Sequence, residues 1–186
     1  MRPIAILCLL ALLVLVATGF VVFRQVSARA SEQNPYQDLR AQALRVTPGD
    51  LGLQLRPDRQ SVYGVVMDMG LPDGTATLAA YSTGDASLYL SSGGGMIGGG
   101  GHAKVRQAAQ ALMQVAESHL TSFSTTSAFD RPAGGRARFF LLTNRGVLAA
   151  TVAEDEVDAG QAPLSPVWHA AQQVLTELRL SVAASG

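Results

Sequence analysis

Residues 62–91, VYGVVMDMGLPDGTATLAAYSTGDASLYLS, decide the fold class of this chain. They contain three runs with strand-like composition, separated by two short turn sequences, Gly70–Gly74 and Thr83–Asp85. In the first turn Pro72 presets φ and a glycine can adopt a positive φ. Because strands joined by such tight turns pair antiparallel, this stretch predicts a three-stranded antiparallel meander.

Helical patterns lie on both sides of the meander. Asn34 and Pro35 have the composition of a helix start, an apolar stripe runs from Val105 to Leu120, and Ser165–Pro166 opens a last helix. A second strand pair is expected at 137–152, with its turn at Thr143–Gly146, a short strand at 51–55, and a charged loop at 154–158.

These elements predict an α+β two-layer sandwich formed by one domain, residues 31–186. It would have an antiparallel sheet of about five strands, with helices mainly on one face, and a transmembrane helix would precede it. The order of elements is similar to that of roadblock, longin and profilin-like modules. The sequence shares no motif with those families, so the similarity implies a fold and no activity.

The N-terminal segment predicts where in the cell the protein is located. Ile4–Phe23 is twenty residues without a charge, long enough as a helix to span a bilayer of roughly 30 Å. Residues 1–30 are therefore expected to be a single-pass anchor in the cell membrane, with the domain facing the periplasm or exterior. The alternative is a cleaved signal peptide and a secreted domain, because Ala28-Arg29-Ala30 fits a cleavage pattern.

Charge and cysteine content exclude several classes of function. The chain has 14 basic and 14 acidic residues, and without residues 1–30 the count is 11 against 14, a net charge of −3. Such a balance argues against nucleic acid as a partner. The one cysteine, Cys8, lies in the apolar segment, so a disulfide within the domain and a Cys-ligated zinc site are excluded. Arginine outnumbers lysine 13 to 1, which is typical of a GC-rich bacterial genome.

The glycine-rich stretch Gly93–Gly101 is the candidate functional segment. Residues 93–98 formally satisfy G-x-G-x-x-G, but the antiparallel setting and the late start of the following helix argue against a dinucleotide site. A helix N-terminus with nearby cations could still bind an anion such as phosphate. The predicted ligand-binding residues are Gly98, Gly99, Gly100, Gly101, His102, Lys104 and Arg106. The alternatives are a flexible connector between strand and helix, or a loop that becomes ordered on a protein partner.

No catalytic, metal or cofactor site is predicted, since the histidines are scattered and no nucleophile motif is present. The expected function is that of a membrane-anchored extracytoplasmic module for protein interaction or envelope assembly, with a protein partner or a second copy bound. The alternative is a domain that binds or hydrolyses a small ligand, phosphate or nucleotide, at the Gly93–Gly101 loop.

Overall fold

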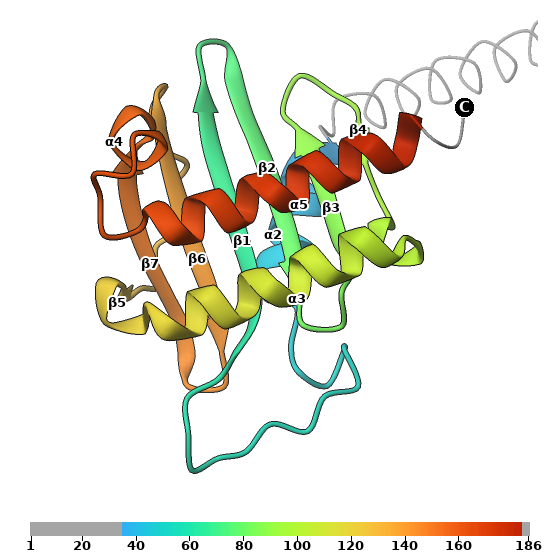
Figure 1. Ribbon diagram of the computed structural model, residues 1–186, viewed down its shortest axis with the longest axis vertical. Helices are drawn as coiled ribbons and strands as arrows, with labels where there is room; N and C mark the ends of the chain where they lie inside the picture. Colours follow the sequence, from blue (N-terminus) through green and yellow to red (C-terminus); the bar gives the residue numbers. More distant parts are fainter. Residues whose placement is uncertain (1–34, 184–186) are drawn as a thin grey trace, which may run out of the picture. The chain divides into compact units, whose positions relative to one another are not determined.

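The computed structural model describes residues 35–183 (Figure 1). The chain forms the following elements in order: α2 (Pro35–Arg45), β1 (Val62–Leu71), β2 (Gly74–Tyr81), β3 (Ala86–Leu90), β4 (Gly95–Met96), the 3-10 turn η1 (Gly99–Gly101), α3 (Ala103–Ser118), the 3-10 turn η2 (Leu120–Ser122), β5 (Ser124–Thr125), β6 (Arg136–Thr143), β7 (Gly146–Ala153), α4 (Glu154–Asp158) and α5 (Ser165–Ala183).

All strands join one antiparallel sheet with the order β4-β3-β2-β1-β6-β7-β5. The predicted meander and hairpin are confirmed: Ala79 of β2 pairs with Val66 of β1 and with Ser87 of β3, and Leu141 of β6 pairs with Leu148 of β7. The α+β class is confirmed as well. The sheet has seven strands rather than about five, because two-residue strands, β4 and β5, extend its two edges. Their short backbone pairings leave no periodicity that a sequence pattern could reveal.

Two helices, α3 and α5, lie side by side across one face of the sheet (Figure 1). Their apolar stripes meet every second residue of the strands and enclose the larger of the two cores. Its fully buried side chains include Met67, Leu78, Leu112, Phe139 and Leu178. Burial of this apolar area from water is the main force that holds the helices on the sheet.

The opposite face carries a smaller core, and α2 covers it. Ala43 and Leu44 pack there with Val66, Ala79 and Phe140. The structure therefore corrects the two-layer description, because α2 adds a layer on the second face. Helical periodicity in the sequence predicts the apolar side of a helix. It does not predict on which face of the sheet that side packs.

Two tyrosines of the sheet close the C-terminal end of α2. The hydroxyl of Tyr81 donates to the carbonyl of Ala43 at 3.0 Å, and that of Tyr63 donates to the carbonyl of Val46 at 3.0 Å. Burial raises the pKa of both phenols, so both keep the proton that they donate.

Two local predictions were wrong. Residues 51–55 form no strand; Leu51, Leu53 and Leu55 pack their side chains against the smaller core from an irregular segment. Residues 154–158 form the short helix α4 and not a loop, because Val157 is buried in the larger core. In both segments contact with distant residues decides the backbone conformation.

Within residues 35–183 no helix has the length and apolar character needed to cross a membrane. The predicted anchor Ile4–Phe23 lies outside the described residues.

Candidate functional site

The glycine-rich segment forms a hairpin followed by a tight turn into α3. The strand pair β3–β4 has Leu88 opposite Met96 and Tyr89 opposite Gly95. Positive φ angles occur at Gly93, Gly94, Gly95 and Gly98. The 3-10 turn η1 then leads through His102 into α3. The segment is thus a folded connector with a defined backbone path.

Close packing explains several of the glycines. A Cβ at Gly95 would collide with the carbonyl oxygen of Leu88, and one at Gly99 would collide with the side chain of Leu178 in α5. At Gly95 the φ of 152° adds a second reason for glycine. These glycines allow the connector to lie directly on β3 and α5, so their presence does not require a phosphate.

A cavity of about 440 Å³ lies where α3 begins and α5 ends. Three of the predicted ligand-binding residues line it, Gly101, His102 and Lys104. Its other lining residues are Ala103, Val105, Glu177, Leu180 and Ser181. The predicted segment therefore does border a cavity, which is formed together with the last turns of α5.

The other four predicted residues do not line this cavity. Gly99 is buried and Gly98 forms the left-handed N-cap of η1. Gly100 lies against Asp85, and its carbonyl accepts a hydrogen bond from Nη1 of Arg106 at 2.6 Å. Arg106 thus binds the connector itself.

The chemistry of the cavity is mixed. The first residues of α3 line the cavity, so the positive end of its helix dipole lies there together with Lys104, and the N-cap residue His102 makes no side-chain capping bond. Glu177 contributes an opposing negative charge, and Leu180 and Val105 contribute apolar surface. The hydroxyl of Ser181 donates to the carbonyl of Leu178 at 2.7 Å.

Exposed apolar side chains gather around the same end of the fold. Among the described residues five large hydrophobic side chains are exposed, and three lie here: Ile97, Leu180 and Val182, with 72%, 56% and 56% of their surface exposed. Gly99, two residues after Ile97, packs on Leu178, and Val182 lies one helical turn beyond Leu178. We call Ile97, Leu180 and Val182 the apolar tip.

A buried polar network under α2 was not predicted. Both carboxylate oxygens of Asp68, which is fully buried in β1, accept hydrogen bonds: from Nε and Nη2 of Arg40 at 2.9 and 2.5 Å, and from the hydroxyl of Thr77 at 2.5 Å. Tyr36 pairs with Thr77 at 2.8 Å. The network joins α2 to the sheet. Its signal was present in the sequence: Asp68 is the one charged residue in the strand VYGVVMDMGL.

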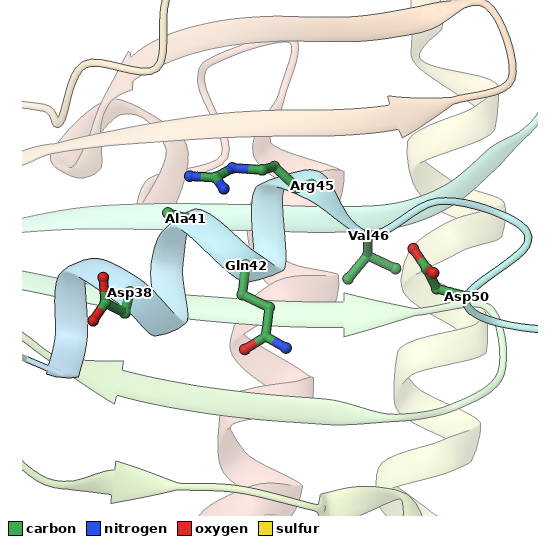
Figure 2. A pocket seen from close by; sticks show the side chains of 6 residues that line it. All are labelled: Asp38, Ala41, Gln42, Arg45, Val46 and Asp50. Atoms are coloured by element: carbon green, nitrogen blue, oxygen red, sulfur yellow. The ribbon is translucent and has the colours of Figure 1, made fainter.

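Two shallow cavities lie near α2. One lies on its outer side. Figure 2 shows Asp38, Gln42 and Arg45 along the helix and Asp50 in the segment that follows it. Asp50 accepts bonds from the N–H and hydroxyl of Thr47, which lower its pKa. The other is lined by Arg40 and residues 129–132, among others. Within residues 35–183 no group of three or more His, Cys, Asp or Glu could hold a metal ion.

The outer edge of β7 is paired along only part of its length. β5 pairs with Leu148 and Ala149, and the N–H of Thr126 donates to the carbonyl of Val147 at 3.0 Å. Since the carbonyl of Val147 points outward, alternation directs the N–H and C=O of Thr151 outward too. Thr151 is exposed, and no strand of the described chain pairs with this part of the edge.

Arg136 and Arg138 place no charge on the outer edge of β7. They lie on β6, opposite Ala153 and Thr151 of β7, in the interior of the sheet. The guanidinium of Arg138 lies 5.2 Å from the centroid of the Phe140 ring and donates to the carbonyl of Ala128 at 3.1 Å. The residues at the free edge, 150–153, are Ala-Thr-Val-Ala, without charge or proline.

Comparison of the chain with protein-family models, with curated proteins and with solved structures finds no match.

Proposed function

We propose that this chain is a membrane-tethered protein-interaction module, held outside the cytoplasm by Ile4–Phe23, that binds an extended segment of its partner along β7. The observation that carries the proposal is the free outer edge of Thr151 within a regular, uncharged strand. An exposed strand edge is a template for pairing with another chain, and protein edges of this kind are usually shielded by charge, proline or a bulge. None of these devices occurs at residues 150–153.

The bound segment would extend the sheet beyond β7, next to the position that β5 already occupies. Backbone hydrogen bonds to Thr151 would supply affinity, and side chains at alternate positions would supply specificity. A second copy of this chain could supply the segment, because two β7 edges related by a two-fold axis can pair antiparallel.

The test replaces Thr151 with proline, which removes the outward N–H and leaves the bonds to β6 in place. The matched control is Thr151→Val, which keeps the N–H and the branched side chain. Full-length chain is extracted from membranes in mild detergent, and the proteins that co-purify, including a second copy, are quantified. Wild type and Thr151→Val should retain the same partner, and Thr151→Pro should weaken it by about tenfold or more. A partner retained equally by the proline variant, or no partner at all, contradicts the proposal.

The alternative function, binding of a small anion at the connector, is tested on the same protein. The cavity beside His102 and Lys104 is the observation that favours it. Inorganic phosphate and nucleotides should then raise the unfolding temperature of the full chain, and Lys104→Gln should abolish the increase. Unchanged unfolding temperatures count against this alternative.

A further inference from the structure

The apolar tip lies beside cationic side chains. Lys104 lines the same cavity as Leu180, Arg106 bonds to the connector at Gly100, and Arg179, next to Leu180 in sequence, is exposed on α5. Two acidic residues, Asp85 and Glu177, lie in the same region, so the local balance is three cations against two anions.

The opposite edge of the sheet carries the reverse charge. α4 follows β7 and contains Glu154, Asp155, Glu156 and Asp158 within five residues, and two cations, Arg136 and Arg138, lie opposite the last residues of β7. The local balance is therefore four anions against two cations at the α4 end, and β4 and α4 lie at opposite sides of the sheet (Figure 1). The net charge of −3 for residues 31–186 is a total over the domain, so it does not show this local difference.

From this arrangement we infer that the β4 end of the domain docks on the anionic surface of the membrane in which the chain's own anchor resides. The apolar tip would enter the interfacial region, with Lys104, Arg106 and Arg179 beside the lipid phosphates. Exposed aliphatic side chains beside an excess of cations are suited to a lipid interface, where apolar burial and attraction to anionic headgroups add together. The acidic α4 end would be repelled from the same surface.

The tether is compatible with this docking. The eleven residues 24–34 join the predicted anchor to α2, and a fully extended chain of that length reaches at most about 40 Å. The chain enters the fold at Tyr36, which bonds to Thr77 of β2. β2 is two strands from β4 and three strands from β7. The inference rests on the membrane tether of the proposed function and is independent of its β7 interface, because docking through β4 would leave the free edge of β7 directed away from the bilayer.

The experiment places a fluorescent probe on full-length chain reconstituted into nanodiscs. The background carries Cys8→Ser, and the probe is attached at Ile97→Cys in the apolar tip or, as control, at Glu156→Cys in α4. Quenching by a lipid with a spin label near its headgroup is measured with and without an anionic phospholipid. Quenching should be strong at position 97, weak at position 156, and dependent on the anionic lipid.

Charge variants provide the second arm. Lys104→Gln and Arg179→Gln should each lower the ratio of docked to free domain about fivefold, the factor that one cation contributes near an anionic bilayer. Lys104→Arg should restore docking, and Arg56→Gln should leave it unchanged, because Arg56 is exposed and its carbonyl bonds to Asn144 in the turn between β6 and β7.

Equal quenching at positions 97 and 156, or quenching that does not depend on anionic lipid, overturns the inference. So does a chain that fails to insert into nanodiscs. A probe at position 97 that is shielded in native membranes but not in pure lipid would assign the tip to a protein partner instead. Failed insertion also contradicts the membrane tether of the proposed function. The other results leave the Thr151 test unaffected, so docking at the tip and binding at β7 can fail separately.

Discussion

At the scale of single residues, the carboxyl group of Glu154 is destabilised in its charged form by burial. Its Oε1 atom is buried and has no hydrogen-bond partner among the described residues. Burial disfavours the charged form and raises the pKa of this carboxyl. Between its ordinary pKa near 4.5 and the raised value, the folded state keeps a proton that the unfolded state has released. The free energy of unfolding therefore falls as the pH rises through this interval.

Replacing Glu154 with glutamine removes this pH dependence. We expect the stability of Glu154→Gln relative to wild type to increase from pH 4 to pH 7, by less than about 1 kcal/mol. Chemical denaturation across this pH range measures the difference. The control is Glu156→Gln, an exposed carboxyl of the same helix, which should show a smaller trend. A flat difference for Glu154→Gln would mean that its burial has no energetic consequence.

At the scale of elements, the connector between β3 and α3 shows that neighbouring glycines have different roles. Gly95 is restricted by its φ and by the carbonyl of Leu88, and Gly99 by Leu178 of α5. At Gly101 a Cβ would meet nothing within 4 Å and the φ is not positive. A glycine count in the sequence cannot separate these cases, because the collisions involve residues of other elements.

This difference gives a prediction for two alanine substitutions. Gly95→Ala should destabilise the domain by about 1–3 kcal/mol, because the new methyl group meets backbone and the φ is strained. Gly101→Ala should be neutral or slightly stabilising, since it restricts only the unfolded chain. Denaturant unfolding of both variants tests this. Equal effects would show that the connector adapts to added side chains.

At the scale of the whole molecule, the sheet is covered on both faces, and a buried ion pair links the second layer to the sheet beside its apolar core. Arg40 of α2 reaches Asp68 across the interface, with 12% and 0% of the two side chains exposed. Nη2 of Arg40 also donates to the carbonyl of Phe129 at 2.8 Å, so the same side chain holds the loop after β5. The pair links three segments that are far apart in sequence.

Breaking this pair should be costly. Asp68→Asn leaves a guanidinium buried without its counter-ion, and we expect a loss of about 3–5 kcal/mol in the free energy of unfolding. The exposed pair Arg56–Asp58 is the matched control, and Arg56→Gln should cost less than about 1 kcal/mol. Similar losses for both variants would mean that the buried pair does not hold α2 in place.

Much of the architecture could be predicted because its signals are local. The turn Gly70–Gly74 depends on the residues within it, and the apolar stripes of α3 and α5 repeat at helical spacing, so short stretches of sequence reveal both. The candidate site was predicted only in part. His102 and Lys104 do border a cavity, but its other wall is the end of α5, more than seventy residues later.

By itself, the sequence determined the α+β class, the antiparallel meander, the hairpin and the starts of α2 and α5, because backbone turns, helix caps and side-chain periodicity are properties of short segments. The tertiary structure decided that α2 covers the second face, that Asp68 lies under Arg40, and that β7 keeps a free edge at Thr151. These features depend on strand order and on pairing between distant residues. They follow from which surfaces fit together once the whole chain is packed.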